Sequence, residues 1–232
     1  MIALENISKS FWVHGRPKVV ARNISAVFPD GARVGILGLN GAGKSSLLSI
    51  IAGTLDPDRG RVVSNGTISW PVGFRGSFHR DLTGAQNVRF IARVYGVDTD
   101  ALADFVEDFA EVGDQYHEPF GSYSSGQQAR LSFGVSMGIA FDTYLVDEAT
   151  STGDEVFKAK SEAVFMERML RSSAVVVSHS ANKLRSLCTM GAVLLDGSLH
   201  VFDDLEEAIA LHKDIIAGKL GGFRPDTDDD EE

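Results

Sequence analysis

Apolar residues occur in two patterns along the chain. Short apolar runs bounded by glycine and aspartate turns predict β-strands, and longer segments in which apolar residues recur every three or four positions predict helices. The expected strands are 19–28, 33–37, the pair 61–64 and 67–70, 143–146, 174–177, and a hairpin turning at Asp196-Gly197. The expected helices are 44–52, much of 87–141, 154–170, a short segment after Ser180, and 205–216. This alternation predicts an α/β fold with an all-helical insertion between strands.

Length and apolar content limit the number of domains. A chain of 232 residues with 44% apolar residues can bury one core, or one core with a small subdomain. Its apolar runs are far shorter than the roughly 20 residues that cross a bilayer, and its first residues lack the pattern of a secretory signal. The single cysteine, Cys188, suits a reducing compartment. We therefore expect a chain that crosses no membrane and stays in the cytosol.

The acidic residues are unevenly distributed. The net charge is −10, and subtracting the six carboxylates between Asp226 and Glu232 leaves −4 for the rest of the chain. We expect residues 217–232 to form an acidic, disordered tail. Because binding to nucleic acid depends on lysine and arginine that neutralise phosphates, this charge argues against tight, nonspecific binding of DNA or RNA.

A second acidic segment lies in the expected helical region. Residues 94–129 contain eight aspartates and glutamates and no lysine or arginine. These charges are either the solvated face of a helix or a surface that docks a partner, and the sequence leaves both readings open.

A glycine-rich segment connects the expected strand 33–37 to the expected helix 44–52. It reads GLNGAGKS and fits the pattern G-x-x-x-x-G-K-[ST], in which the curled backbone points its amides at phosphates. An ordinary glycine-rich turn is the alternative, but a strand before the segment and a helix after it favour a P-loop. We expect Lys44 to reach the β- and γ-phosphates of a nucleotide and the Ser45 hydroxyl to ligate Mg²⁺. The expected phosphate-binding residues are Gly38, Asn40, Gly41, Gly43, Lys44, Ser45 and Ser46.

The apolar strand 143–146 ends in two carboxylates, Asp147 and Glu148. Ligands gather at the carboxyl ends of parallel strands, so Asp147 is expected beside the P-loop, where it would hold Mg²⁺ through water. Glu148 would then face the γ-phosphate and orient or deprotonate the attacking water. Taken alone, such a pair is usually only the point where a strand meets solvent.

A third segment, Tyr-Ser-Ser-Gly-Gln-Gln at 123–128, precedes an expected helix. Free amides at a helix N-terminus and the Ser124 hydroxyl suit a phosphate, although serine and glycine are also ordinary helix caps. Farther along, Asp154 follows Glu148 by six residues, and His179 ends the strand 174–177.

Along the chain the order is the P-loop, the segment 123–128, the acidic strand end and then His179, and four motifs in this order resemble those of ABC transporter ATPases. The resemblance covers residues 1–216 and implies a P-loop NTPase fold with an N-terminal antiparallel β subdomain and an all-helical subdomain at about 83–141. It matches 123–128 with the family's LSGGQ signature, His179 with the switch histidine and Asp154 with the D-loop.

The resemblance also implies a partner and a set of contacts. In this family two copies pair head to tail, so the signature of one chain closes over the ATP on the P-loop of the other. Glu148, His179 and Lys44 would be catalytic, and ATP with Mg²⁺ would be bound. An aromatic residue usually stacks on adenine; Phe11 matches best and Trp12 is the neighbouring candidate, although either could pack in the core. The further nucleotide contacts implied are Ser124, Ser125, Gly126, Gln127 and Asp154.

One family motif is missing, because no glutamine of a Q-loop occurs from Ser46 to Ala85. The stretch Ile-Ser-Trp-Pro-Val-Gly-Phe at 68–74, with the signature and Gly153-Asp154, resembles the ATPase of bacterial capsular-polysaccharide exporters. This implies a peripheral subunit at the cytoplasmic face of the inner membrane that drives export of a lipid-linked glycan through a separate permease. Periplasmic and outer-membrane components would act farther on. We expect 70–79 to form an apolar floor for the permease, flanked by the acidic residues between 98 and 118.

Other functions stay open. The ATPase of an O-antigen, teichoic-acid, drug or small-lipid exporter would carry the same motifs. A soluble ABC-type ATPase acting on nucleic acid usually has a long coiled coil or a second ATPase domain, and the sequence predicts neither. A noncatalytic interaction subunit is disfavoured because the lysine, the two carboxylates and the histidine are all present.

Overall fold

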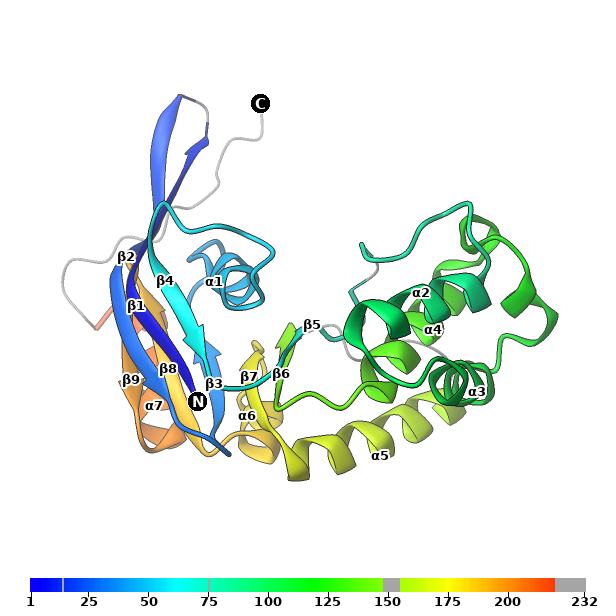
Figure 1. Cartoon of the computed structure of the whole chain (residues 1–232). Helices are drawn as coiled ribbons and strands as arrows, with labels where there is room; N and C mark the ends of the chain where they lie inside the picture. The colour runs from blue at the N-terminus through cyan, green and yellow to red at the C-terminus, as the bar shows by residue number, and fades with distance from the viewer. Residues whose placement is uncertain (14, 75, 148–154, 220–232) are drawn as a thin grey trace, which may run out of the picture.

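The computed structural model describes residues 1–13, 15–74, 76–147 and 155–219, and Figure 1 shows that they form two lobes. The first lobe holds two β-sheets with α1 (Lys44–Ile51), α6 (Ala181–Leu187) and α7 (Leu205–Ile216). The second lobe holds α2 (Gly84–Tyr95), α3 (Thr99–Ala110) and α4 (Ser125–Gly138). The long helix α5 (Glu155–Arg171) runs from one lobe to the other.

A six-stranded sheet forms the centre of the first lobe. Its order is β5, β6, β7, β3, β8, β9, and all neighbouring pairs are parallel except β8 and β9. Its strands are β3 (Arg33–Leu37), β5 (Ile68–Pro71), β6 (Thr143–Asp147), β7 (Ser173–Val177), β8 (Met190–Leu195) and β9 (Ser198–Phe202). In β7, Val175 and Val177 belong to the core shared with α1, whereas Ala174 and Val176 belong to the core shared with α6 and α7. Both faces of the sheet are therefore covered, as parallel sheets require.

A separate antiparallel sheet consists of β1 (Ile2–Val13), β2 (Arg16–Phe28) and β4 (Arg59–Ser64), with β1 in the middle. The expected pairing of 61–64 with 67–70 is wrong, because β4 pairs with β1 and β5 pairs with β6. Distant contacts draw β5 away: the Leu145 amide donates to Ser69 Oγ at 2.9 Å, and Trp70 Nε1 donates to Ser136 Oγ at 3.0 Å. The sequence pattern also did not predict β1, although it predicted most of β2.

The second lobe begins with a reciprocal helix cap. The Gln86 amide donates to Thr83 Oγ1 at 3.1 Å, and the Thr83 amide donates to Gln86 Oε1 at 2.9 Å, which satisfies two donors at the start of α2. An aromatic cluster joins this lobe to α5, because the Phe109 ring lies 5.9 Å from Phe133 and 5.4 Å from Phe157 between ring centres. The expected helical stretch 87–141 thus consists of three helices and two short 3₁₀ turns.

The expected α/β class, with an antiparallel β part and a helical part, is confirmed. Across the residues that the structure describes, no helix combines the length and the apolar composition needed to cross a membrane.

The closest packing between α7 and the sheet occurs at Gly191 in β8. A Cβ atom there would lie 2.3 Å from the Cβ of Ala208, which is fully buried in α7. We expect Gly191→Ala to lower the free energy of unfolding by about 1–3 kcal/mol through overpacking. Ala208→Gly alone should cost about 1 kcal/mol of helix propensity. Denaturant unfolding of both single variants and the double variant checks this: the double variant should lose less than the sum, and strict additivity would contradict the contact.

Candidate nucleotide-binding site

A cavity of about 360 Å³ lies between the β1–β2 hairpin, the loop after β3, and the ends of β6 and β7. It brings together many of the residues that the sequence predicted at a nucleotide. These are Phe11, Asn40, Gly41, Gly43, Lys44, Ser45, Ser46, Asp147 and His179. Lys18, Val13, Val20 and Val177 complete the described wall.

Parallel pairing of three strands places the polar residues at one edge of the sheet. β7 lies between β3 and β6, and Val177 of β7 is opposite both Ile36 and Asp147. The residues that follow β3 form the P-loop, and His179 follows β7 by two residues. The carboxylate, the histidine and the P-loop therefore share the carboxyl edge, where α/β sheets bind ligands.

The P-loop backbone requires glycine at Gly43. Its φ is +105°, and a Cβ atom there would lie 2.7 Å from the Cβ of Val20 in the hairpin. Lys44 opens α1 and is only 7% exposed. Its ammonium donates to the carbonyl oxygens of Gly38 at 2.8 Å and Leu39 at 2.9 Å, which offset the cost of burying a charge. These bonds hold the loop in a curled shape with Lys44 on the cavity wall.

These residues fit a nucleoside triphosphate with Mg²⁺. The amides of the loop, the N-terminus of α1 and the Lys44 ammonium are phosphate donors. The Ser45 hydroxyl and the Asp147 carboxylate are both on the wall and offer the hard oxygen ligands that Mg²⁺ takes.

The two faces of the β1–β2 hairpin separate Phe11 from Trp12. Phe11 is opposite Lys18 across the strands, and both line the cavity. Trp12 is opposite Pro17, is 78% exposed and is not on the cavity wall. Of the two aromatic residues considered for adenine stacking, only Phe11 is therefore in position.

Sequence reasoning missed Lys18. Its ammonium lies 3.2 Å from the point that a Cβ of Gly41 would occupy, so it stands over the P-loop. A strand prediction for 2–13 would have revealed the cross-strand pairing with Phe11, but that segment carried no clear alternation.

Sequence reasoning also missed His212 of α7, which no motif marks. Burial lowers the pKa of His212, a hydrogen bond to the Gly38 carbonyl acts in the opposite direction, and the nearby Lys44 ammonium lowers the pKa further. His212 is therefore mainly neutral at neutral pH, and α7 meets the P-loop without adding a charge beneath Lys44.

The signature segment is in the other lobe, at the start of α4. The Gln127 amide donates to Ser124 Oγ at 3.2 Å, and the Ser124 amide donates to Gln127 Oε1 at 2.9 Å. Ser125 and Gly126 occupy the first helical positions, where amides have no acceptor within the helix. None of the residues described on the cavity wall comes from 124–127, so one chain alone does not bring these amides to its P-loop. Two further predicted residues, Glu148 and Asp154, lie outside the described residues.

A P-loop with a buried lysine, facing an acidic strand end across parallel strands, defines a nucleotide-binding P-loop protein. The chain matches the model of the ABC transporter family over residues 21–151. It is 41% identical over 216 residues to the polysialic acid transport ATP-binding protein KpsT of Escherichia coli, covering 92% of this chain and 99% of that protein. It is 39% identical over 208 residues to the capsule polysaccharide export ATP-binding protein CtrD of Neisseria meningitidis serogroup B, covering 90% and 96%.

A solved structure shares the fold. The dimeric ATP-binding cassette MJ0796 in a post-hydrolysis state matches with a TM-score of 0.70 at 22% identity, covering 88% of this chain and 99% of that one. The chain belongs to the ABC transporter family as an ATP-binding ATPase cassette. Cassettes of this family dimerise and work with a membrane permease.

Lys18 provides a test of the cavity. We expect Lys18→Met to weaken ATP binding about fivefold, close to 1 kcal/mol for one exposed charge pair, and high salt should reduce the difference. Titration calorimetry measures the dissociation constant. Arg16→Met is the matched control, because Arg16 is in the same hairpin but is not among the described wall residues. Equal affinity of the two variants would remove Lys18 from the site.

Proposed function

We propose that this chain is the ATP-hydrolysing subunit of an exporter that moves a lipid-linked capsular polysaccharide through a separate permease. The observation that carries the ATPase part is the cavity that unites Lys44, Ser45 and Asp147 at one sheet edge. The cargo is supported by relatives named for polysialic acid transport and capsule polysaccharide export, which align over nearly their whole length. The subunit would act at the cytoplasmic face of the bacterial inner membrane, and periplasmic and outer-membrane components would carry the polysaccharide onward.

The described residues divide the work of holding a triphosphate. Lys44 binds the β- and γ-phosphates from its anchor on the P-loop carbonyls, and the loop amides surround them. Ser45 and Asp147 hold Mg²⁺, which neutralises phosphate charge when it is bound. Phe11 stacks on the adenine and Lys18 stands over the loop.

The hydrolytic step uses groups at the ends of β6 and β7. Glu148 directly follows the metal ligand Asp147 in sequence, and we assign it to orient the attacking water and accept its proton. His179 lines the same cavity and contacts the γ-phosphate as it develops charge. Asp154, which matches the D-loop, is assigned to the nucleotide contacts.

The position of the signature supports a head-to-tail homodimer. Ser124, Ser125, Gly126 and Gln127 begin a helix in one lobe, whereas the P-loop is in the other lobe. A second copy turned head to tail would place its helix N-terminus over the bound phosphates and add amide donors that one chain lacks there.

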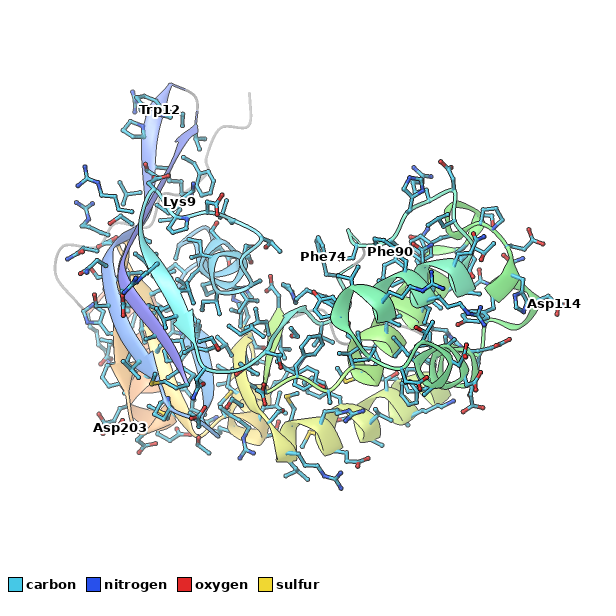
Figure 2. The ribbon with its side chains drawn as sticks, viewed as in Figure 1. Lys9, Trp12, Phe74, Phe90, Asp114 and Asp203 are labelled. Carbon is cyan, nitrogen blue, oxygen red and sulfur yellow. The ribbon has the colours of Figure 1, made fainter. Side chains whose placement is uncertain are left out.

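The permease docks on the helical lobe in this proposal. Three apolar residues of the expected floor at 70–79 are unavailable to a partner, because Trp70, Val72 and Phe78 are buried. Phe78 stacks on Phe120 with ring centres 4.8 Å apart, so it is part of the core. Phe74 remains 46% exposed, and Figure 2 labels it together with Phe90 of α2, which is exposed as well.

Three exposed apolar side chains therefore replace the expected floor. Phe90 is 55% and Val94 is 62% exposed, and their spacing of four residues puts both on one face of α2. Exposed apolar side chains that gather in this way mark interaction sites.

The acidic residues between 98 and 118 have different roles. Asp98 caps α3, and Glu111 accepts a hydrogen bond from Lys160 at 2.6 Å, so both serve the fold. Asp104, Asp108 and Asp114 are exposed. Because cytoplasmic loops of membrane proteins are rich in lysine and arginine, we propose that these carboxylates speed docking of the permease.

The export function is tested in cells from which the gene for this chain is deleted and to which the wild-type chain or a variant is returned. Lys44→Ala should abolish surface polysaccharide because nucleotide binding is lost, and Glu148→Gln should abolish it while ATP binding persists. In purified complexes, Glu148→Gln should slow hydrolysis at least about a hundredfold, the low end for a positioned base. Equal amounts of protein by immunoblot are the control. Normal surface polysaccharide in both variants would contradict the proposal that the cargo is a capsular polysaccharide. Normal hydrolysis by Glu148→Gln would contradict the assignment of Glu148 as the base.

Phe74 and Phe78 form a matched pair for the docking surface. We expect Phe74→Ala to keep the melting temperature and lose stimulation of the ATPase by the permease, because the exposed ring anchors the partner. Phe78→Ala should instead lower the free energy of unfolding by about 3–5 kcal/mol, since it removes a buried ring. Thermal melting of the isolated subunit and ATPase assays in proteoliposomes separate the two. Full stimulation of Phe74→Ala would contradict this docking site.

A further inference from the structure

The β1–β2 hairpin projects from the first lobe and carries the most exposed large apolar side chain described. Figure 1 shows the hairpin rising above the lobe, and Figure 2 shows Trp12 at its tip. Trp12 is 78% exposed, and Val19 on the same face of the hairpin is 40% exposed. Trp12, Pro17 and Val19 therefore place exposed apolar side chains together on one face of the hairpin tip, and gathered apolar side chains mark interaction sites.

Alternation along the strands gives the hairpin two different faces. Phe11 and Lys18 face the nucleotide cavity, whereas Trp12 is paired with Pro17 and Ser10 with Val19 on the opposite face. The outer face therefore has its own apolar strip, which the nucleotide does not use.

The hairpin also differs in charge from the rest of the chain. Residues 9–22 contain Lys9, Arg16, Lys18 and Arg22 and no carboxylate, and subtracting these four positive charges from −10 leaves −14 elsewhere. Lys9 is engaged with Asp58 at 3.0 Å and Lys18 faces the cavity. Arg16 and Arg22 are both exposed; Arg16 is at the tip, where it pairs with Val13, whereas Arg22 packs against Gly197 of the β8–β9 turn.

We propose that the tip of the β1–β2 hairpin binds the anionic lipid surface of the membrane beside the permease, with Trp12 among the headgroups and Arg16 on lipid phosphates. Tryptophan favours the interface between water and bilayer, and each nearby cation adds attraction to anionic lipid. The proposal rests on the proposed function in one respect, because docking on a permease brings the chain within reach of lipid.

The size and charge of the surface favour lipid over a protein partner. A specific protein interface buries about 800 Å² on each side, which a two-stranded tip with one indole does not offer. An anionic leaflet repels the rest of the chain, whose net charge is −14, and attracts the hairpin, so the charge distribution favours an orientation with the hairpin toward lipid. The acidic side chains of α3 then face the basic loops of the permease rather than lipid.

The arrangement links the membrane to the nucleotide. Trp12 is adjacent to Phe11 in the chain, and Pro17 is adjacent to Lys18. Phe11 and Lys18, which line the cavity, therefore each have a neighbour on the face that we assign to lipid. Binding of the tip to the membrane would restrain the strands that carry Phe11 and Lys18. ATP binding would then lose less conformational entropy in these strands.

Two tryptophans make the experiment direct. Trp12 is 78% exposed and Trp70 is 5% exposed, so quenching by aqueous acrylamide reports mainly on Trp12. The full chain is mixed with vesicles of phosphatidylcholine alone or with phosphatidylglycerol added. With the anionic vesicles we expect a blue shift, protection from acrylamide, and quenching by brominated lipid. Trp12→Phe, which retains only Trp70, should show none of these changes.

Variants then measure the contribution of each group. Trp12→Ala should weaken sedimentation with anionic vesicles about tenfold or more, the effect of losing one large apolar side chain from the interface. Arg16→Gln should weaken it about fivefold. Leu170→Ala, in α5, removes another apolar side chain that is 73% exposed and should have no effect.

The affinity for ATP without vesicles should be the same in all three variants, which separates failure of this proposal from failure of the nucleotide site. Equal binding to neutral and anionic vesicles, an unshifted Trp12 spectrum, or an effect of Trp12→Ala only when the permease is present would each overturn the lipid contact. The last result would assign the tip to the permease instead.

Discussion

The parallel pairing of β3, β7 and β6 is the constraint on which the candidate site depends. Val177 sits opposite Ile36 on one side and Asp147 on the other, so the three strands end level with one another. A slip of one residue would turn each buried side chain of β7 to the wrong core and move Asp147 away from the P-loop. The alternation of Val175 and Val177 with Ala174 and Val176 between two cores prevents that slip.

The P-loop contains a buried charge, the ammonium group of Lys44, whose burial is compensated by hydrogen bonds. Lys44 is 7% exposed, and two carbonyl oxygens of its own loop accept hydrogen bonds from its ammonium group. Gly43 allows the close approach of Val20, so the β1–β2 hairpin closes the loop from above. The hairpin therefore belongs to the nucleotide site on one face, and its other face, with Trp12, is available to a different surface.

The helical lobe carries the signature segment and a separate group of exposed apolar side chains. Ser124 and Gln127 satisfy each other at the start of α4, which leaves the next amides of that helix for a ligand from another chain. Phe109 and its aromatic neighbours fix α4 and α5 together, so the signature is held on a packed lobe rather than on a loop. Phe74, Phe90 and Val94 mark a different side of the lobe, where apolar side chains remain exposed.

The sequence alone determined the P-loop, the acidic end of β6, the signature cap and the position of His179, because each depends on a short spacing or on where a strand ends. It also determined the α/β class through its alternating periods. Only the tertiary structure decided that β4 and β5 belong to different sheets, that Phe78 is buried against Phe120, and that Lys18 and His212 stand beside the P-loop. These features depend on contacts between residues far apart in the chain. Local periodicity does not determine them, because it does not specify which distant segment pairs with a strand or packs against a ring.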